Sequence, residues 1–157
     1  MTQRFFINYR HEDSWGTASH LYRKLAMRFG AENVFYDNAT LRYGEDWTKE
    51  ISSSVERAAV LIALIGPRWR SILADRARRG GDDYVLREIG HALRAGHVTV
   101  VPLRVDEAAL PTADELPDEV CPLLGLESVR IHHTDLLDES ACERLLARLA
   151  ELARDTG

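Results

Sequence analysis

Residues 59–65 read Ala-Val-Leu-Ile-Ala-Leu-Ile, and this uninterrupted apolar stretch decides the fold. A strand that is apolar at every position must be covered on both faces, which is typical of the centre of a parallel sheet. Four shorter segments rich in β-branched or aromatic residues accompany it, at residues 5–9, 34–36, 98–103 and 129–131. Together they predict five strands.

The segments between these strands carry helical patterns. Apolar residues recur at spacings of three and four over residues 18–29 and 47–58, and a last helix begins at a predicted capping box that starts with Ser140. Strands that alternate with helices predict an α/β fold, a flavodoxin-like five-stranded parallel sheet with helices on both faces. Residues 71–83 look irregular and are interpreted as an exposed connection, the alternative being a mobile loop over a site. Residues 104–128 contain three prolines and predict a loop.

Length and composition limit the classes of protein to consider. A chain of 157 residues with 45% hydrophobic content predicts one domain, residues 1–157, although the last four residues are either a frayed helix end or a cut before a further domain. The net charge of −5 disfavours binding to nucleic acid or to anionic membranes, and no apolar stretch is long enough to span a bilayer. Cys121 and Cys142 lack metal-ligand spacing, and the six histidines show no convincing metal pattern. We therefore expect a cytoplasmic protein without a metal, and the scarcity of lysine hints at a bacterial source.

Residues 84–93, Tyr-Val-Leu-Arg-Glu-Ile-Gly-His-Ala-Leu, contain the candidate catalytic group. At 100° per residue their apolar side chains gather on one helix face, and Glu88 falls on its border, one turn after Tyr84. A carboxylate in that position, preceded by an aromatic ring, is able to line a cleft. The simpler interpretation is a solvated glutamate at the edge of the helix face.

Ligands of an open α/β sheet bind beyond the carboxyl ends of its strands, so residues just after each strand are informative. Arg10 follows the first strand, Asp37 the second, and Gly66 with Pro67 the third. The GxGxxG, P-loop and GxSxG motifs are absent from the sequence, which leaves dinucleotide dehydrogenases, nucleoside triphosphatases and α/β-hydrolases unsupported. A phosphorelay receiver requires an aspartate where Gly66 stands, so this class is rejected.

Five short motifs, in order, resemble the Toll and interleukin receptor (TIR) family, especially its bacterial branch. They are Phe6-Ile7-Asn8-Tyr9-Arg10 with Glu12-Asp13-Ser14, Val34-Phe35-Tyr36-Asp37, Leu41-Arg42-Tyr43-Gly44-Glu45-Asp46-Trp47, Leu64-Ile65-Gly66-Pro67-Arg68-Trp69, and Glu88-Ile89 with Ala92-Leu93. The resemblance covers nearly the whole chain. It implies that residues 37–46 form the BB loop, which mediates self-association and borders the ligand cleft.

Enzymatic members of the family cleave NAD+ between nicotinamide and ribose, using a glutamate four residues after an aromatic residue. The resemblance therefore implies that Glu88 is catalytic and that Tyr84, where the family usually has tryptophan, forms an aromatic wall. Asn8 replaces the family's common serine, and we interpret this change as structural. Because the nicotinamide of NAD+ is cationic, it leaves as a neutral molecule without a general acid, and Glu88 would stabilise the positive charge that develops at the anomeric carbon.

The predicted substrate-binding residues are Arg10, Trp47, Tyr84, Tyr9 and Asp37. A guanidinium suits phosphate oxygens, so Arg10 is expected to contact the NAD+ diphosphate, the alternative being a surface charge. Trp47 faces either the nicotinamide or the space between helix and sheet. Asp37 is better explained as a loop cap, and Trp69 as a core residue.

The resemblance also implies activation by assembly. The BB-loop residues Arg42, Tyr43 and Gly44 are expected to join copies of the chain into a homo-oligomer that hydrolyses NAD+ to ADP-ribose or a cyclic isomer, in immune signalling or phage defence. NAD+ is then a substrate, and no cofactor is expected. A non-catalytic module that binds other TIR domains is the alternative from another class. A third reading keeps the enzyme but makes its product a signal for a separate effector.

Overall fold

The computed structural model describes residues 4–36 and 47–154, with the backbone alone for residues 47–51. Within these residues the strands form a five-stranded parallel sheet in the order β2-β1-β3-β4-β5. Their bounds are β1 Phe5–Asn8, β2 Val34–Tyr36, β3 Val60–Ile65, β4 Thr99–Val105 and β5 Val129–Ile131. The predicted doubly wound parallel sheet is confirmed.

The chain reverses its direction of travel across the sheet between β1 and β3. It first passes from β1 outward to β2, and then returns to add β3, β4 and β5 on the other side of β1. Asn8, at the carboxyl end of β1, pairs in register with Ala63 of β3. This edge is the topological switch point, where sheets of this type bind their ligands.

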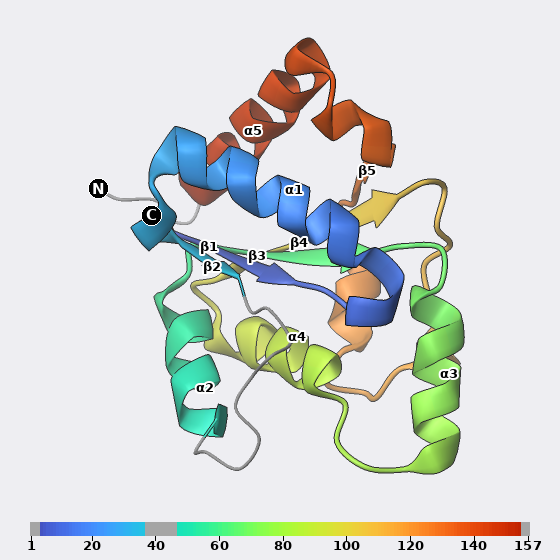
Figure 1. Ribbon diagram of the computed structural model, residues 1–157. Coiled ribbons are helices and arrows are strands. Elements are labelled where there is room, and N and C mark those ends of the chain that lie inside the picture. The colour runs from blue at the N-terminus through green and yellow to red at the C-terminus, as the bar shows by residue number, and fades with distance from the viewer. Residues whose placement is uncertain (1–3, 37–46, 155–157) are drawn as a thin grey trace.

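Helices cover both faces of the sheet (Figure 1). Helices α1 and α5 lie on one face, and α2 and α4 lie on the other. The bounds are α1 His11–Phe29, α2 Trp47–Arg57, α3 Trp69–Arg79, α4 Tyr84–Ala95 and α5 Glu139–Arg154. The buried side chains of α3 join the cluster on the α2 and α4 face. None of the helices in the described ranges is both long and apolar enough to cross a membrane.

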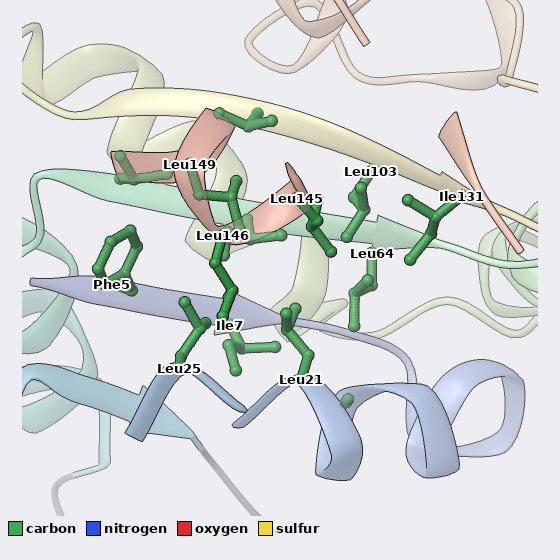
Figure 2. Packing of buried hydrophobic residues seen from close by; sticks show 14 of the residues in the cluster. Phe5, Ile7, Leu21, Leu25, Leu64, Leu103, Ile131, Leu145, Leu146 and Leu149 are labelled. Carbon is green, nitrogen blue, oxygen red and sulfur yellow. The ribbon is translucent and has the colours of Figure 1, made fainter. Parts of the chain in front are cut away.

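Two hydrophobic clusters result, one on each face of the sheet. Figure 2 shows the first, in which Leu21 and Leu25 of α1 and Leu145, Leu146 and Leu149 of α5 meet the sheet. The second cluster lies beneath α2, α3 and α4. Strand β3 is buried at all six positions because its side chains alternate between the two clusters. Its continuous apolar sequence is thereby explained.

The interpretation of residues 71–83 as an irregular connection is wrong. Helix α3 occupies most of this segment and ends at Gly80, whose φ of 74° suits glycine. It is anchored by two buried residues, Trp69 and Leu73, and its exposed end is rich in arginine, a good helix former. So few apolar positions make a weak stripe, which explains why the periodicity was not recognised.

The start of α5 also differs from the expected capping box at Ser140. The helix begins at Glu139, and the Asp138 side chain accepts a hydrogen bond from the Ala141 amide at 3.0 Å. Asp138 is therefore the N-cap, a role for which aspartate and serine are about equally suited. The proline-rich segment 104–128 is a connection with two short 3₁₀ helices, Ala113–Glu115 and Cys121–Gly125, as its prolines predict.

His97 joins the end of α2 to the end of α4. Its Nε2 atom lies 2.6 Å from the Glu56 carbonyl oxygen, and its Nδ1 atom lies 3.1 Å from the Ala95 carbonyl oxygen. Both neighbours are acceptors, so both contacts are hydrogen bonds only when the ring is protonated. The hydrogen bond to Glu56, followed by that to Ala95, raises the pKa of His97.

This contact predicts a pH-dependent contribution to stability. The folded-state pKa of His97 lies above the unfolded value of about 6.5, so its contribution is fully present below that pH and is lost as pH rises through the folded-state pKa. Urea unfolding of the wild type and His97→Gln at about pH 6 and about pH 9 measures this effect. We expect the difference between their free energies of unfolding to shrink at the higher pH. A constant difference would contradict the prediction.

Candidate active site

The end of β1 sends alternate side chains to opposite faces of the sheet. Phe6 packs in the cluster beneath α4, whereas Tyr9 packs in the cluster beneath α1 and α5. The Tyr9 ring stacks on Tyr36 with centroids 5.5 Å apart. The structure therefore does not bring Tyr9 to the face that α4 covers, and its role in substrate binding stays a prediction.

Glu88 is a buried residue, with 9% of its surface exposed. Its Oε1 atom accepts a hydrogen bond of 2.7 Å from Nδ2 of Asn8. The simpler interpretation of Glu88 as a solvated glutamate at the helix edge is therefore wrong. Burial of a carboxylate carries a free-energy cost, which hydrogen bonds to the charged form offset.

Asn8 makes a second contact that fixes its orientation. The same Nδ2 atom donates to the Val85 carbonyl oxygen at 3.1 Å, and Asn8 is fully buried. Val85 and Glu88 are three residues apart on α4, so one amide group reaches both. Sequence reasoning treated Asn8 as purely structural. The signal that could have identified it was its place as the last residue of β1, at the switch point.

Arg10 lies two residues after Asn8 and is also buried. Its NH1 and NH2 atoms donate to the two carboxylate oxygens of Asp83 at 3.1 and 2.8 Å. The side chains of Arg10 and Asp83 are 0% and 12% exposed. The guanidinium carbon lies 4.6 Å from the centre of the Trp69 ring. Arg10 is thus not a surface charge, and Trp69 is a buried core residue, as predicted.

Asp83 couples this ion pair to the helix that carries Glu88. It is the N-cap of α4, and its Oδ1 atom also accepts from the Leu86 amide at 3.4 Å. The first turn of α4 is therefore tied to β1 at two places, through Arg10 and through Asn8. These contacts set where Glu88 lies relative to the carboxyl edge of the sheet.

The loop after β3 is held by Asp13 of α1. Its two carboxylate oxygens accept from the amides of Gly66 at 2.8 Å and Arg68 at 2.7 Å. A Cβ atom at Gly66 would lie 2.6 Å from Asp13 Oδ2. Glycine is therefore required for the carboxylate to approach this closely. The contact holds the loop that leads from β3 to Trp69, the first residue of α3.

Tyr84, one turn before Glu88, lies at the surface with 41% of its area exposed. The guanidinium carbon of Arg87 is 5.8 Å from the centre of its ring. An exposed aromatic next to a buried carboxylate suits a wall against which a planar ligand stacks. Among the described residues, no group of three histidine, cysteine or acidic side chains is arranged to hold a metal ion.

A hollow at the other edge of the sheet does not belong to this arrangement. It is lined by Arg4 and Asn33, which precede β1 and β2, together with Ser54 and Arg57 of α2. These residues mark the amino ends of the strands, whereas Asn8 and Arg10 mark the carboxyl end of β1.

The comparison with family models identifies the chain. A model described as TIR domain matches residues 5–149. The chain belongs to the TIR domain family. The resemblance to this family that the five motifs indicated is thereby confirmed, and the bacterial branch stays a prediction.

The fold agrees with that of a solved TIR structure. The TIR domains of the activated Roq1 resistosome that directly recognises the pathogen effector XopQ are 18% identical to this TIR domain, with a TM-score of 0.53. The match covers 97% of this chain and 84% of that one. The CMP N-glycosidase BcmB of Clostridium botulinum is 14% identical, with a TM-score of 0.48, over 94% of this chain and 98% of that one. No curated protein matches this chain.

Several predicted residues of this TIR domain lie outside the described residues. They are Asp37 and the BB-loop residues Arg42, Tyr43 and Gly44. Trp47 is the first residue of α2, and only its backbone is described. The structure brings together Asn8 and Glu88, and Arg10 with Asp83 and Trp69. The assignments of Asp37, Trp47 and the BB loop stay predictions.

Proposed function

We propose that this TIR domain is an NAD+ hydrolase that cleaves the bond between nicotinamide and ribose. One observation carries the proposal: Glu88 is a buried carboxylate, hydrogen-bonded by the last residue of β1, at the switch point of the sheet. Structural carboxylates are mostly exposed or paired with cations. Glu88 is buried, and the Asn8 amide that donates to it is neutral, so this hydrogen bond leaves the negative charge in place for a cationic transition state.

The chemistry requires one carboxylate and water. As the bond from the anomeric carbon to the pyridinium nitrogen breaks, its electron pair goes to nicotinamide, which leaves as a neutral molecule. Positive charge develops at the anomeric carbon, and Glu88 stabilises it electrostatically. Water then adds to that carbon and loses a proton, giving ADP-ribose. Attack by a nucleophilic atom of the same substrate would instead give a cyclic isomer.

The remaining site assignments belong to this proposal. Tyr84 supplies an aromatic wall, and Trp47 at the start of α2 faces the nicotinamide. The contact between Arg10 and the NAD+ diphosphate stays a prediction. It would require the guanidinium to exchange Asp83 for phosphate, because both terminal nitrogens are already engaged. NAD+ is the substrate, and no cofactor takes part.

We further propose that assembly controls activity. Copies of the chain associate through the BB-loop residues Arg42, Tyr43 and Gly44, in the cytoplasm of a bacterium, and the enzyme acts in immune signalling or phage defence. We also propose that residues 1–157 form a single domain. The outcome of the reaction is either depletion of NAD+ or a product that acts as a signal for a separate effector.

Self-assembly predicts that activity depends on protein concentration. We expect the rate of nicotinamide release per subunit to rise with concentration of the wild-type protein and with crowding, because the active species contains more than one copy. Chromatography of the reaction mixture, with light scattering in parallel, measures both quantities. Full activity per subunit at high dilution would contradict control by assembly. No release from a folded, assembled protein would favour the non-catalytic interaction module instead.

A further inference from the structure

Asn8 holds Glu88 in a defined orientation. Both atoms that its Nδ2 group contacts, Oε1 of Glu88 and the carbonyl oxygen of Val85, are acceptors. The amide nitrogen must therefore face α4, since the flipped amide would place Oδ1 against two other oxygens. The orientation of the amide follows from its partners, and it directs an N–H bond at the carboxylate.

Within the part of the chain that the structure describes, the oxygen atom of the Asn8 amide does not contribute a hydrogen bond to the stability of the fold. Oδ1 of Asn8 is buried and has no hydrogen-bond partner among the described residues. An unpaired buried acceptor costs free energy, so a residue serving stability alone would not be expected to carry one. Asn8 joins β1 to the backbone of α4 through the contact with Val85. The contact with Glu88 needs a separate explanation.

We propose that Asn8 is a positioning residue for the Glu88 carboxylate, a role that rests on the proposed NAD+ cleavage. The hydrogen bond to Oε1 restricts rotation of the carboxylate, so that its charge is held in one place when the anomeric carbon becomes positive. Because the amide is neutral, it stabilises the ionised carboxylate without cancelling its charge. A cation in its place would weaken the attraction to the transition state.

Asn8→Asp tests this role with a side chain of the same shape. The variant replaces the donor by a second carboxylate 2.7 Å from Oε1, and two carboxylates at that distance cannot both ionise freely. We expect the acidic limb of the pH profile of kcat to move to higher pH, and kcat near neutrality to fall by about tenfold or more. In the wild type, Arg10 and Asp83 at this end of β1 and α4 are paired with each other, and Arg87 of α4 is paired with Asp82.

Asn8→Ser is the second variant, which replaces the amide by a shorter hydroxyl without adding a charge. We expect it to lower kcat with little change in KM and to move the acidic limb less than Asn8→Asp does, because it weakens one hydrogen bond to the ionised carboxylate without adding a like charge. Asn33→Asp is the matched control. Asn33 is likewise buried, and its Nδ2 donates to the Phe29 carbonyl oxygen at 2.6 Å, before β2 and away from Glu88. Its substitution should lower thermal stability and leave the pH profile in place.

A readout that does not need activity separates this proposal from the proposed function. In ¹³C NMR of the side-chain carboxyl groups, the Glu88 signal is the one absent from Glu88→Gln, and we expect Asn8→Asp to raise its titration midpoint. An unchanged midpoint and pH profile in folded Asn8→Asp would overturn the positioning role. Absence of nicotinamide release from the wild type, with a shifted midpoint, would overturn the NAD+ hydrolase and support the contact itself.

Discussion

Glu88→Gln is expected to lower the rate of nicotinamide release by about a hundredfold to a thousandfold, the range typical for loss of one electrostatic group in an active site. Glutamine keeps the size and hydrogen-bonding capacity of the side chain but removes its charge. The neutral amide does not stabilise the cationic anomeric carbon. Because Glu88 is 9% exposed, removal of its charge should not lower the stability of the fold.

The matched control is Glu12→Gln. Glu12 lies in the first turn of α1, just after the end of β1, and its side chain is 53% exposed and 3.8 Å from Arg76. The substitution makes the same change in net charge at the same edge of the sheet. We expect its rate to stay within about twofold of the wild type, because exposed charges are screened by water.

Both variants and the wild type are compared at a concentration where light scattering shows equal assembly. Nicotinamide and the second product are separated by chromatography, and thermal unfolding verifies the fold. A Glu88→Gln protein that releases nicotinamide at the wild-type rate would rule out the proposed chemistry. The second product, ADP-ribose or a cyclic isomer, decides between transfer to water and transfer within the substrate.

The architecture could be predicted from the sequence where one physical signal dominates. The predicted strand at residues 59–65 differs from β3 by one residue, because a strand buried on both faces is apolar at every position and its ends are easily recognised. Helix α3 was missed because only Trp69 and Leu73 are buried in its 11 residues, too few to make an apolar stripe. Its stability depends on contacts with the sheet, which a periodicity does not record.

The site was predictable only in part. The place of Glu88 on the border of the apolar face of α4 indicated a candidate, but its burial depends on β1, which is about 80 residues away in the sequence. Asn8 and Arg10 could be placed at the edge of the sheet from topology alone. Their partners could not, because the pairing depends on how α4 packs against the end of β1.

Tyr9 shows how one residue of register decides which face of the sheet a side chain meets. Its neighbours Asn8 and Arg10 point toward α4, so Tyr9 must point to the other face. The sequence alone predicts this alternation, because Phe6 and Asn8 are two residues apart and face the same side of the sheet, whereas Tyr9 is one residue further and faces the other side.

Arg10→Met is expected to cause the largest loss of stability among these variants, about 3–5 kcal/mol in the free energy of unfolding. The substitution leaves the Asp83 carboxylate, 12% exposed, without its bidentate partner at the start of α4. Urea unfolding measures the loss. Arg10→Lys should recover only part of it, because an ammonium does not match both carboxylate oxygens.

Asp83→Asn separates a structural role of Arg10 from the predicted contact with the NAD+ diphosphate. If Arg10 serves mainly to anchor α4, Asp83→Asn lowers stability and kcat as Arg10→Met does. The double variant Arg10→Met/Asp83→Asn then recovers part of the stability, because it leaves neither charge of the pair buried without its partner. If Arg10 serves mainly to bind phosphate, Asp83→Asn releases the guanidinium and lowers KM for NAD+, whereas Arg10→Met raises it. We expect the first outcome, because the Arg10 side chain is 0% exposed and both of its terminal nitrogens donate to the carboxylate of Asp83. Double-mutant additivity in the stability measurement, together with opposite shifts of KM in the two single variants, would contradict it.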